Sequence, residues 1–403
     1  MGKQRVWLVS EVFYPDTDIA TANIATDIAL KFRENFEVHV ICGPQDYERK
    51  NQEIKSEALK DIHLHRWKYF NYDKNHKFKR LIRVIGISLG LFLKGLKIKK
   101  HDKVFVISNP AFITPLYALL RLIKGFRFTL LMHDVFPENL IVGGYTRETN
   151  IFYRLTKALF VKCRRAAEKI IVLGRDMKTL LLEHFPISRK DDIIIVPNWA
   201  DIESVYPLED KQTPLLKQLQ LQDKVVILFA GNHGVLQNLL AFIKIIEKAR
   251  NPHVHCIFAG GGATKKELEA YVEAHQIPNI TFLPPFPRSE MNQMLNSCHI
   301  GLVSLSDAVY GVGVPSKSYN ILSAGKPILF LGNTDSEIAQ YVIENNLGWA
   351  FAYRDEEQIR DFLLSLDTSK LEEIRNKGLA GRNNVVQCYS KEAILERLMQ
   401  VML

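Results

Sequence analysis

The chain has 403 residues, of which 47% are hydrophobic and 24% charged, and its formal net charge is +9. These proportions are typical of a soluble globular protein, and the length predicts two domains of about 200 residues each. Five scattered cysteines without a C-x-x-C pair indicate reduced thiols in a cytoplasm and exclude a disulfide framework or a cysteine metal site. The first residues lead into a strand pattern without a signal-peptide hydrophobic region.

The first half of the sequence alternates short apolar runs with helical patterns. Strands are expected at 6–13, 37–43, 103–109, 128–135, 169–174 and 193–198, and helices at 20–32, 113–123, 150–167 and 177–185. Apolar runs separated by helices predict a parallel sheet covered on both faces. We therefore expect an α/β domain with a doubly wound, Rossmann-like sheet over residues 1–198.

A basic segment interrupts this half. Ten lysines and arginines and a single acid, Asp102, lie between Lys74 and Lys103, around an apolar run at 84–96 that is too short to span a bilayer. The segment could lie on an anionic membrane surface, or it could be a buried helix with basic ends. No zinc finger, helix-turn-helix or aromatic RNA motif accompanies the charge, which disfavours nucleic acid as a partner.

The pattern lapses between Trp199 and Lys224 and then restarts. We interpret 199–223 as a linker, 224–385 as a second doubly wound domain, and 386–403 as a terminal helix that packs back on the first domain. Strands are expected at 225–232, 253–262, 280–286, 299–305, 327–332 and 349–353. Ligands of such sheets bind at the carboxyl ends of the strands, here in a predicted cleft between the domains.

The stretch 311–330 carries the most specific pattern. Pro315 and Ser316 suit the first turn of a helix, whose register places Tyr319 and Leu322 on one face and Lys317 and Asn320 on another. A lysine in the first turn opposes the helix dipole, and a bound anion would remove that cost. The alternative is a solvated lysine on an ordinary helix.

Glycines and polar residues follow other strands of the second half. Because glycines allow a backbone to approach a ligand closely, the loops together suggest a binding site, although each alone is more often a packing feature. The candidates are Gly231, Asn232, His233, Gly234 and Gln237 in the first loop, Gly260 and Gly261 in the second, and Phe286, Pro287 and Arg288 in the third.

In the first half, His133 and Asp134 end one strand and are followed by Glu138. Such a histidine could position an acceptor hydroxyl or polarise a sugar group, or it could be a hydrogen-bonded residue of a domain interface. Tyr14, Asp16 and Asp18 follow the first strand and are expected to face the same cleft. No Asp-x-Asp pair suited to a nucleotide-bound metal is present.

Several of these motifs together resemble the retaining glycosyltransferases of family 4, which have the GT-B fold. The matching motifs are FYP, HDVFPEN, VPNW, FAGNHGVLQNL, FAGGG and, above all, VPSKSYNILSAGKPIL, so the resemblance covers nearly the whole chain. It is strongest to the bacterial branch that builds colanic acid and the O-antigen or capsule repeats of surface polysaccharide, including fucosamine transferases. It implies a hexosyl-type transferase at the cytoplasmic membrane face.

The resemblance also implies roles for the candidate residues. A UDP-sugar would bind the second domain and a polyprenyl-diphosphate-linked glycan acceptor the first, with neither metal nor cofactor. Lys317 and the 231–234 amides would hold the diphosphate, 286–288 would contact the base and Asn320 the ribose. Val314 to Ser316 would also contact the nucleotide-sugar. His133 would contact the transferred sugar. The family's Glu-x7-Glu pair falls at Val312 and Asn320, so both carboxylates are missing.

Two further functions fit the same architecture. A nucleotide-sugar 2-epimerase shares the two-domain fold, although it usually carries acidic and histidine residues that are absent here. A non-catalytic glycan-assembly partner would explain why Val312 and Asn320 replace the two carboxylates. Turnover of a nucleotide-sugar separates this partner from the transferase, and dependence on an acceptor separates the transferase from the epimerase.

Overall fold

The computed structural model describes residues 2–16, 19–45, 59–69, 77–209 and 214–403. Asp18, an expected acceptor-side residue, and residues 74–76 of the basic segment lie outside these ranges. The chain forms two compact units. The first comprises Met1–Pro197 and Leu395–Leu403, and the second comprises Asn198–Ile394, which includes the expected linker 199–223.

The first unit contains a seven-stranded sheet in the order β3-β2-β1-β4-β5-β6-β7, in which every pair is parallel. Its central strands are buried on both faces, which explains their continuous apolar sequences. The strands are β1 (Gln4–Ser10), β2 (Phe36–Cys42), β3 (Ile62–Arg66), β4 (Lys103–Ile107), β5 (Arg127–Leu131), β6 (Lys169–Val172) and β7 (Ile193–Ile195).

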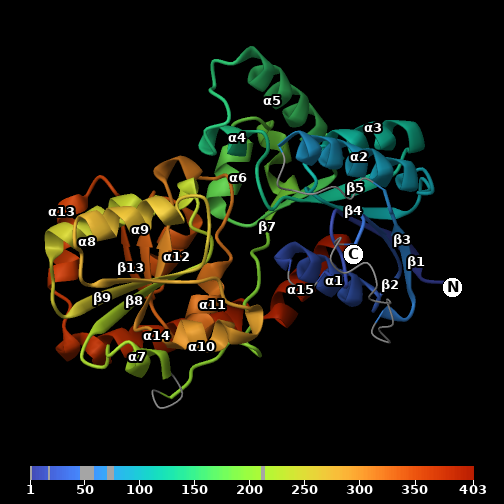
Figure 1. The fold of residues 1–403 in the computed structure, drawn as a ribbon. Helices are drawn as coiled ribbons and strands as arrows, with labels where there is room; N and C mark the ends of the chain where they lie inside the picture. The colour runs from blue at the N-terminus through green and yellow to red at the C-terminus, as the bar shows by residue number, and fades with distance from the viewer. Residues whose placement is uncertain (1, 17–18, 46–58, 70–76, 210–213) are drawn as a thin grey trace. The chain divides into compact units, whose positions relative to one another are not determined.

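Helices cover both faces of this sheet. Within the first unit, α2 and α3 lie on one face, and α1 lies with the end of α15 on the other (Figure 1). Lys31 of α1 pairs with Glu396 of α15 at 3.0 Å, and the Lys169 ammonium donates to the Val401 carbonyl. The helices are α1 (Ala20–Phe32), α2 (Lys77–Gly95), α3 (Ile113–Lys124), α4 (Glu138–Val142), α5 (Ile151–Arg164), α6 (Arg175–Leu182) and α15 (Lys391–Met402).

The second unit contains a six-stranded parallel sheet in the order β10-β9-β8-β11-β12-β13. The strands are β8 (Val225–Ala230), β9 (Val254–Ala259), β10 (Ile280–Leu283), β11 (Ile300–Ser304), β12 (Ile328–Leu331) and β13 (Gly348–Phe351). The helices are α7 (Pro214–Gln218), α8 (Leu239–Ala249), α9 (Lys265–Ala274), α10 (Met291–Asn296), α11 (Lys317–Ser323), α12 (Glu337–Glu344), α13 (Glu356–Leu364) and α14 (Leu371–Cys388).

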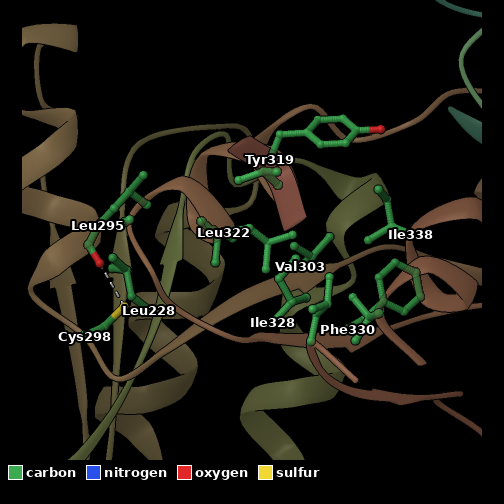
Figure 2. Close-up of a cluster of buried hydrophobic side chains, with 14 of the residues drawn as sticks. Leu228, Leu295, Cys298, Val303, Tyr319, Leu322, Ile328, Phe330 and Ile338 are labelled. Carbon is green, nitrogen blue, oxygen red and sulfur yellow. Dashed lines mark hydrogen bonds between the residues drawn. The ribbon is translucent and has the colours of Figure 1, made fainter. Parts of the chain in front are cut away.

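Two hydrophobic clusters hold this sheet between its helices. One cluster packs α8, α9 and α13 against one face, and the other packs α10, α11, α12 and α14 against the opposite face. Figure 2 shows the second cluster, in which Tyr319 and Leu322 of α11 lie among residues of the sheet such as Val303 and Phe330. Burial of two large side chains fixes the rotation of this short helix about its axis.

The expected fold class of two doubly wound, Rossmann-like parallel sheets is confirmed. The sequence analysis missed β3, whose residues alternate between aliphatic and histidine side chains within a polar stretch. The strand lies at the edge of the sheet, and β2 is the one strand it pairs with among the residues that the structure describes. An edge strand is buried less than a central one, so its hydrophobic signal is weak.

Candidate functional site

Lys317 begins α11 on the side away from the hydrophobic cluster. Its ammonium lies 3.7 Å from the centre of the Phe229 ring in β8, close enough for a cation–π contact. Burial lowers the pKa of Lys317 to about 7. A substantial fraction of this lysine is therefore uncharged near neutral pH, and a nearby anion would restore its charge.

The glycine loops after β8 and β9 are in direct backbone contact. Gly231 and Gly260 adopt φ values of 142° and 139°, which side chains rarely allow. A Cβ on Gly260 would lie 2.0 Å from the Gly231 carbonyl oxygen, and one on Gly262 would lie 2.4 Å from that of His233. The close approach therefore requires glycine at these positions.

His233 is fully buried beside the point where these two glycine loops meet. Its backbone N–H donates to the Gly261 carbonyl at 2.7 Å, and its own carbonyl accepts from the Thr264 backbone and hydroxyl. Neither ring nitrogen makes a hydrogen bond with a residue that the structure describes. Burial, reinforced by Lys265 and Lys317, lowers the pKa of His233 to about 4. His233 is therefore uncharged at neutral pH.

The remaining predicted residues of the second unit lie around Lys317, His233 and the two glycine loops. Asn232 is exposed, and its amide lies beside Gly234 and Gly262. Gln237 accepts from the Gly234 N–H at 3.1 Å, which closes the first loop. The loop after β9 meets the loop after β10, because a Cβ on Gly261 would lie 3.1 Å from Pro285.

Residues 286–288 and the start of α11 are held by local contacts. Phe286 and Val314 pack at the margin of the hydrophobic cluster, and Pro287 precedes Arg288, which pairs with Asp201 at 3.3 Å. The Pro315 carbonyl accepts from Ser318, and Ser316 is exposed at the helix start. Asn320 is partly buried, and its amide has no hydrogen-bond partner within the described ranges.

Sequence reasoning missed three residues that contact Lys317, His233 or the glycine loops. Phe229 lies under Lys317, Thr264 holds the His233 carbonyl, and Lys265 donates to the carbonyls of Gly260 and Leu283 at 2.9 and 2.8 Å. Thr264 and Lys265 follow the glycine run 260–262 after a single alanine, which was a signal that could have been used. Phe229 reads as an ordinary core residue of a strand, so no local pattern distinguishes it.

The predicted residues of the first unit follow two strands of its sheet that have one strand between them. Tyr14 and Asp16 follow β1, and His133 follows β5, with β4 between them in the sheet. The His133 N–H donates to Ser108 at 3.2 Å, its Nε2 is buried without a partner in the described structure, and burial lowers its pKa to about 4. The Tyr14 carbonyl accepts a hydrogen bond from the Arg66 guanidinium. Asp16 is buried.

Glu138 and Asp134 lie in different environments. Glu138 is buried and pairs with the equally buried Arg164 at 2.9 Å, beside the Phe136 carbonyl, which also accepts from Arg164. Removing one member of a buried ion pair leaves the other charge uncompensated, so this pair has a structural role. Asp134 is exposed.

Comparison with known proteins identifies the family. Residues 22–204 match the model of Glycosyltransferase Family 4, and residues 212–378 match that of Glycosyl transferases group 1. A Pseudomonas aeruginosa protein named "Probable glycosyltransferase WbjE" is 30% identical over 335 residues, which are 81% of this chain and 82% of that protein. The chain belongs to glycosyltransferase family 4. A second relative of this glycosyltransferase, Escherichia coli (strain K12) WcaI, is named for colanic acid biosynthesis; it is 24% identical over 65% of each chain.

Solved structures resemble the glycosyltransferase over its whole length. A sucrose-phosphate synthase from Thermosynechococcus elongatus aligns with a TM-score of 0.74 at 13% identity, covering 99% of this chain and 98% of that one. Anabaena Alr3699/HepE in complex with UDP aligns with a TM-score of 0.69 at 13% identity, covering 99% of each chain. At this identity the likeness shows the GT-B fold alone.

Proposed function

We propose that this glycosyltransferase moves a hexosyl-type sugar from a UDP-sugar to a growing, lipid-linked bacterial surface glycan, with retention of anomeric configuration. The observation that carries this proposal is the position of Lys317, held over Phe229 with a lowered pKa. A diphosphate would supply the negative charge that this partly buried lysine lacks. The names of WbjE and WcaI, and the UDP complex of the Anabaena protein, support the substrate class.

In the proposed reaction the bond between the anomeric carbon and the diphosphate breaks, and a bond from that carbon to the acceptor oxygen forms. Charge develops on the departing diphosphate, which Lys317 and the amides of residues 231–234 stabilise. The proton of the acceptor hydroxyl passes to that phosphate. In this scheme residues 286–288 contact the nucleotide base, Asn320 contacts the ribose and His133 contacts the transferred sugar. No metal takes part in this scheme.

The acceptor side includes an anionic membrane surface. In the first unit, α2, α3 and α5 contain no Asp or Glu. Ten exposed apolar side chains on these helices form what we term the apolar surface: Ile85, Leu89, Leu93, Leu119, Leu122, Ile123, Ile151, Phe152, Leu155 and Leu159. Apolar side chains on basic helices are typical of binding to anionic lipid. No helix in the described ranges is long and apolar enough to cross a bilayer.

The test is turnover of UDP-sugars by the full chain, with and without a polyprenyl-diphosphate-linked acceptor extract. The proposal predicts UDP release and a lengthened lipid-linked glycan only when the acceptor is present. Conversion of the sugar without acceptor would instead support the 2-epimerase. Nucleotide binding without turnover of any UDP-sugar would support a non-catalytic glycan-assembly partner.

A further inference from the structure

A cluster of histidines lies on one face of the first unit's sheet, and none of its members is assigned to sugar transfer. In the register of β1, β2 and β3, Trp7, His39 and His63 pair in a row. Side chains two residues apart on a strand point to the same face. Glu37 and His65 therefore share this face with His39 and His63.

From this arrangement we propose that Glu37, His39 and His63 bind a divalent transition-metal ion such as Zn²⁺. One ligand atom of each residue lies within 4.8 Å of the other two. The Glu37 carboxylate lies 3.0 Å from His39 Nε2 and 3.9 Å from His63 Nε2. Tetrahedral zinc with bonds of about 2.0–2.1 Å separates its ligand atoms by about 3.3 Å. The His63 side chain, 55% exposed, has room for the small movement required.

Two neighbours hold His39 in an orientation suited to a ligand. Its ring stacks on Trp7 with the ring centres 4.5 Å apart, and its Nδ1 lies 3.1 Å from His65 Nε2. When Nδ1–H donates to His65, the lone pair of His39 Nε2 points toward Glu37 and His63. Metal-binding histidines generally make such a hydrogen bond through the second ring nitrogen. His65 is thus a positioning residue.

The donor atoms of the cluster, rather than the charges around it, favour a metal that prefers imidazole. Arg5 beside Glu37, and Lys94 and Lys97 near His65, place positive charge close to the cluster. Glu37 is the single carboxylate of the cluster, and Arg5 lies 3.6 Å from it. Ca²⁺ and Mg²⁺ need several oxygen ligands, whereas two imidazoles and one carboxylate suit Zn²⁺.

A bound ion would link β2 to β3, the edge strand of the sheet. Because the site needs both strands in register, the metal would bind the folded protein and raise its stability. This role is independent of nucleotide-sugar binding, since the ligands lie in the first unit and the proposed diphosphate site lies in the second.

The test is titration of Zn²⁺ into the untagged full chain by calorimetry, with Co²⁺ absorption as a report of coordination geometry. We expect one equivalent to bind, and His63→Ala or His39→Ala to weaken it by at least about tenfold. His65→Ala, which removes only the orienting bond, is expected to weaken it by about 10–100-fold. His275→Ala is the control, because His275 pairs with Glu247 alone at 2.9 Å.

His63→Ala is the decisive variant, because an exposed side chain can be removed without unfolding the protein. Zn²⁺ should raise the melting temperature of wild type and of His275→Ala, and should leave that of His63→Ala unchanged. Absence of one-to-one binding at micromolar Zn²⁺ would overturn the proposal. Binding that is as tight in His63→Ala as in wild type would also overturn it.

Discussion

Lys317 is the residue on which the proposed chemistry depends, and its surroundings give it an unusual titration. Burial lowers its pKa to about 7, so it loses its charge as the pH rises above neutrality. A bound diphosphate would favour the charged form and raise this pKa again. Nucleotide binding above pH 7 should therefore take up a proton.

The predicted consequence is a pH-dependent affinity for UDP. Between pH 7.5 and 9 the terminal phosphate is fully ionised, and the dissociation constant should rise by about tenfold per pH unit as Lys317 deprotonates. Calorimetry in buffers of different ionisation enthalpy measures both the affinity and the proton uptake. His233, with a pKa of about 4, is neutral throughout this range. If the dissociation constant of UDP rose as steeply with pH in Lys317→Met as in wild type, the assignment of this pH dependence to Lys317 would be contradicted.

At this scale the sequence proposed Lys317 and the glycine loops as site residues, and it did not indicate Phe229, which Lys317 contacts in the structure. The helix pattern correctly placed Tyr319 and Leu322 on the buried face and Lys317 on another. It could not reveal Phe229, because contact between a strand and a helix so far along the chain is set by tertiary packing. It also could not reveal that burial leaves His233 uncharged.

At the scale of elements, the crossing of the β8 and β9 loops decides the shape of the candidate site. Gly260→Ala should place a Cβ 2.0 Å from the Gly231 carbonyl and force the loops apart. The positive φ adds strain of order 1–3 kcal/mol. We expect a lower melting temperature and a loss of UDP affinity in calorimetry.

A matched substitution separates the clash from the backbone strain. Gly144 has a φ of 71°, and a Cβ there would meet nothing within 4 Å. Gly144→Ala should therefore cost stability through strain alone and leave UDP affinity unchanged. Equal UDP binding by wild type and Gly260→Ala would show that the loop crossing does not shape the site.

The apolar surface of α2, α3 and α5 is the second element-scale feature. Replacing Leu122, Phe152 and Leu155 together by Glu should weaken binding to phosphatidylglycerol vesicles by well over about tenfold. Each buried apolar side chain contributes about 1.5–3 kcal/mol, and the new charges repel anionic lipid. Co-sedimentation measures the change, and Leu379→Glu, at an exposed position of α14, is the control. Undiminished binding by the triple variant would exclude this surface as the membrane contact.

The sequence predicted only part of this surface. The run at 84–96 left a membrane-bound and a buried helix equally open, and in the structure one side of α2 is buried while Ile85, Leu89 and Leu93 are exposed. The contributions of α3 and α5 were missed, because their apolar residues fitted ordinary amphipathic helices. Which apolar residues stay uncovered depends on the neighbours of each helix.

For the whole molecule, the alternation of apolar runs and helices was sufficient to predict two parallel sheets. The signal was strong because strands buried on both faces are continuously apolar, as in β8 and β9. The boundaries between the two units were harder to predict. Residues Leu395–Leu403, which include most of α15, belong to the first unit, although α15 begins within the second.

The measurement that tests the central claim most directly is calorimetric titration of UDP, with GDP for comparison, into wild type and Lys317→Met. We predict that UDP binds, that GDP binds much less well, and that the substitution weakens UDP binding by about 1.5–3 kcal/mol, as for a lost charged hydrogen bond. Lys326→Met, three residues beyond the end of the same helix, should bind UDP as wild type does. UDP binding that is equally tight in Lys317→Met, or no nucleotide binding by wild type, would contradict the proposed site.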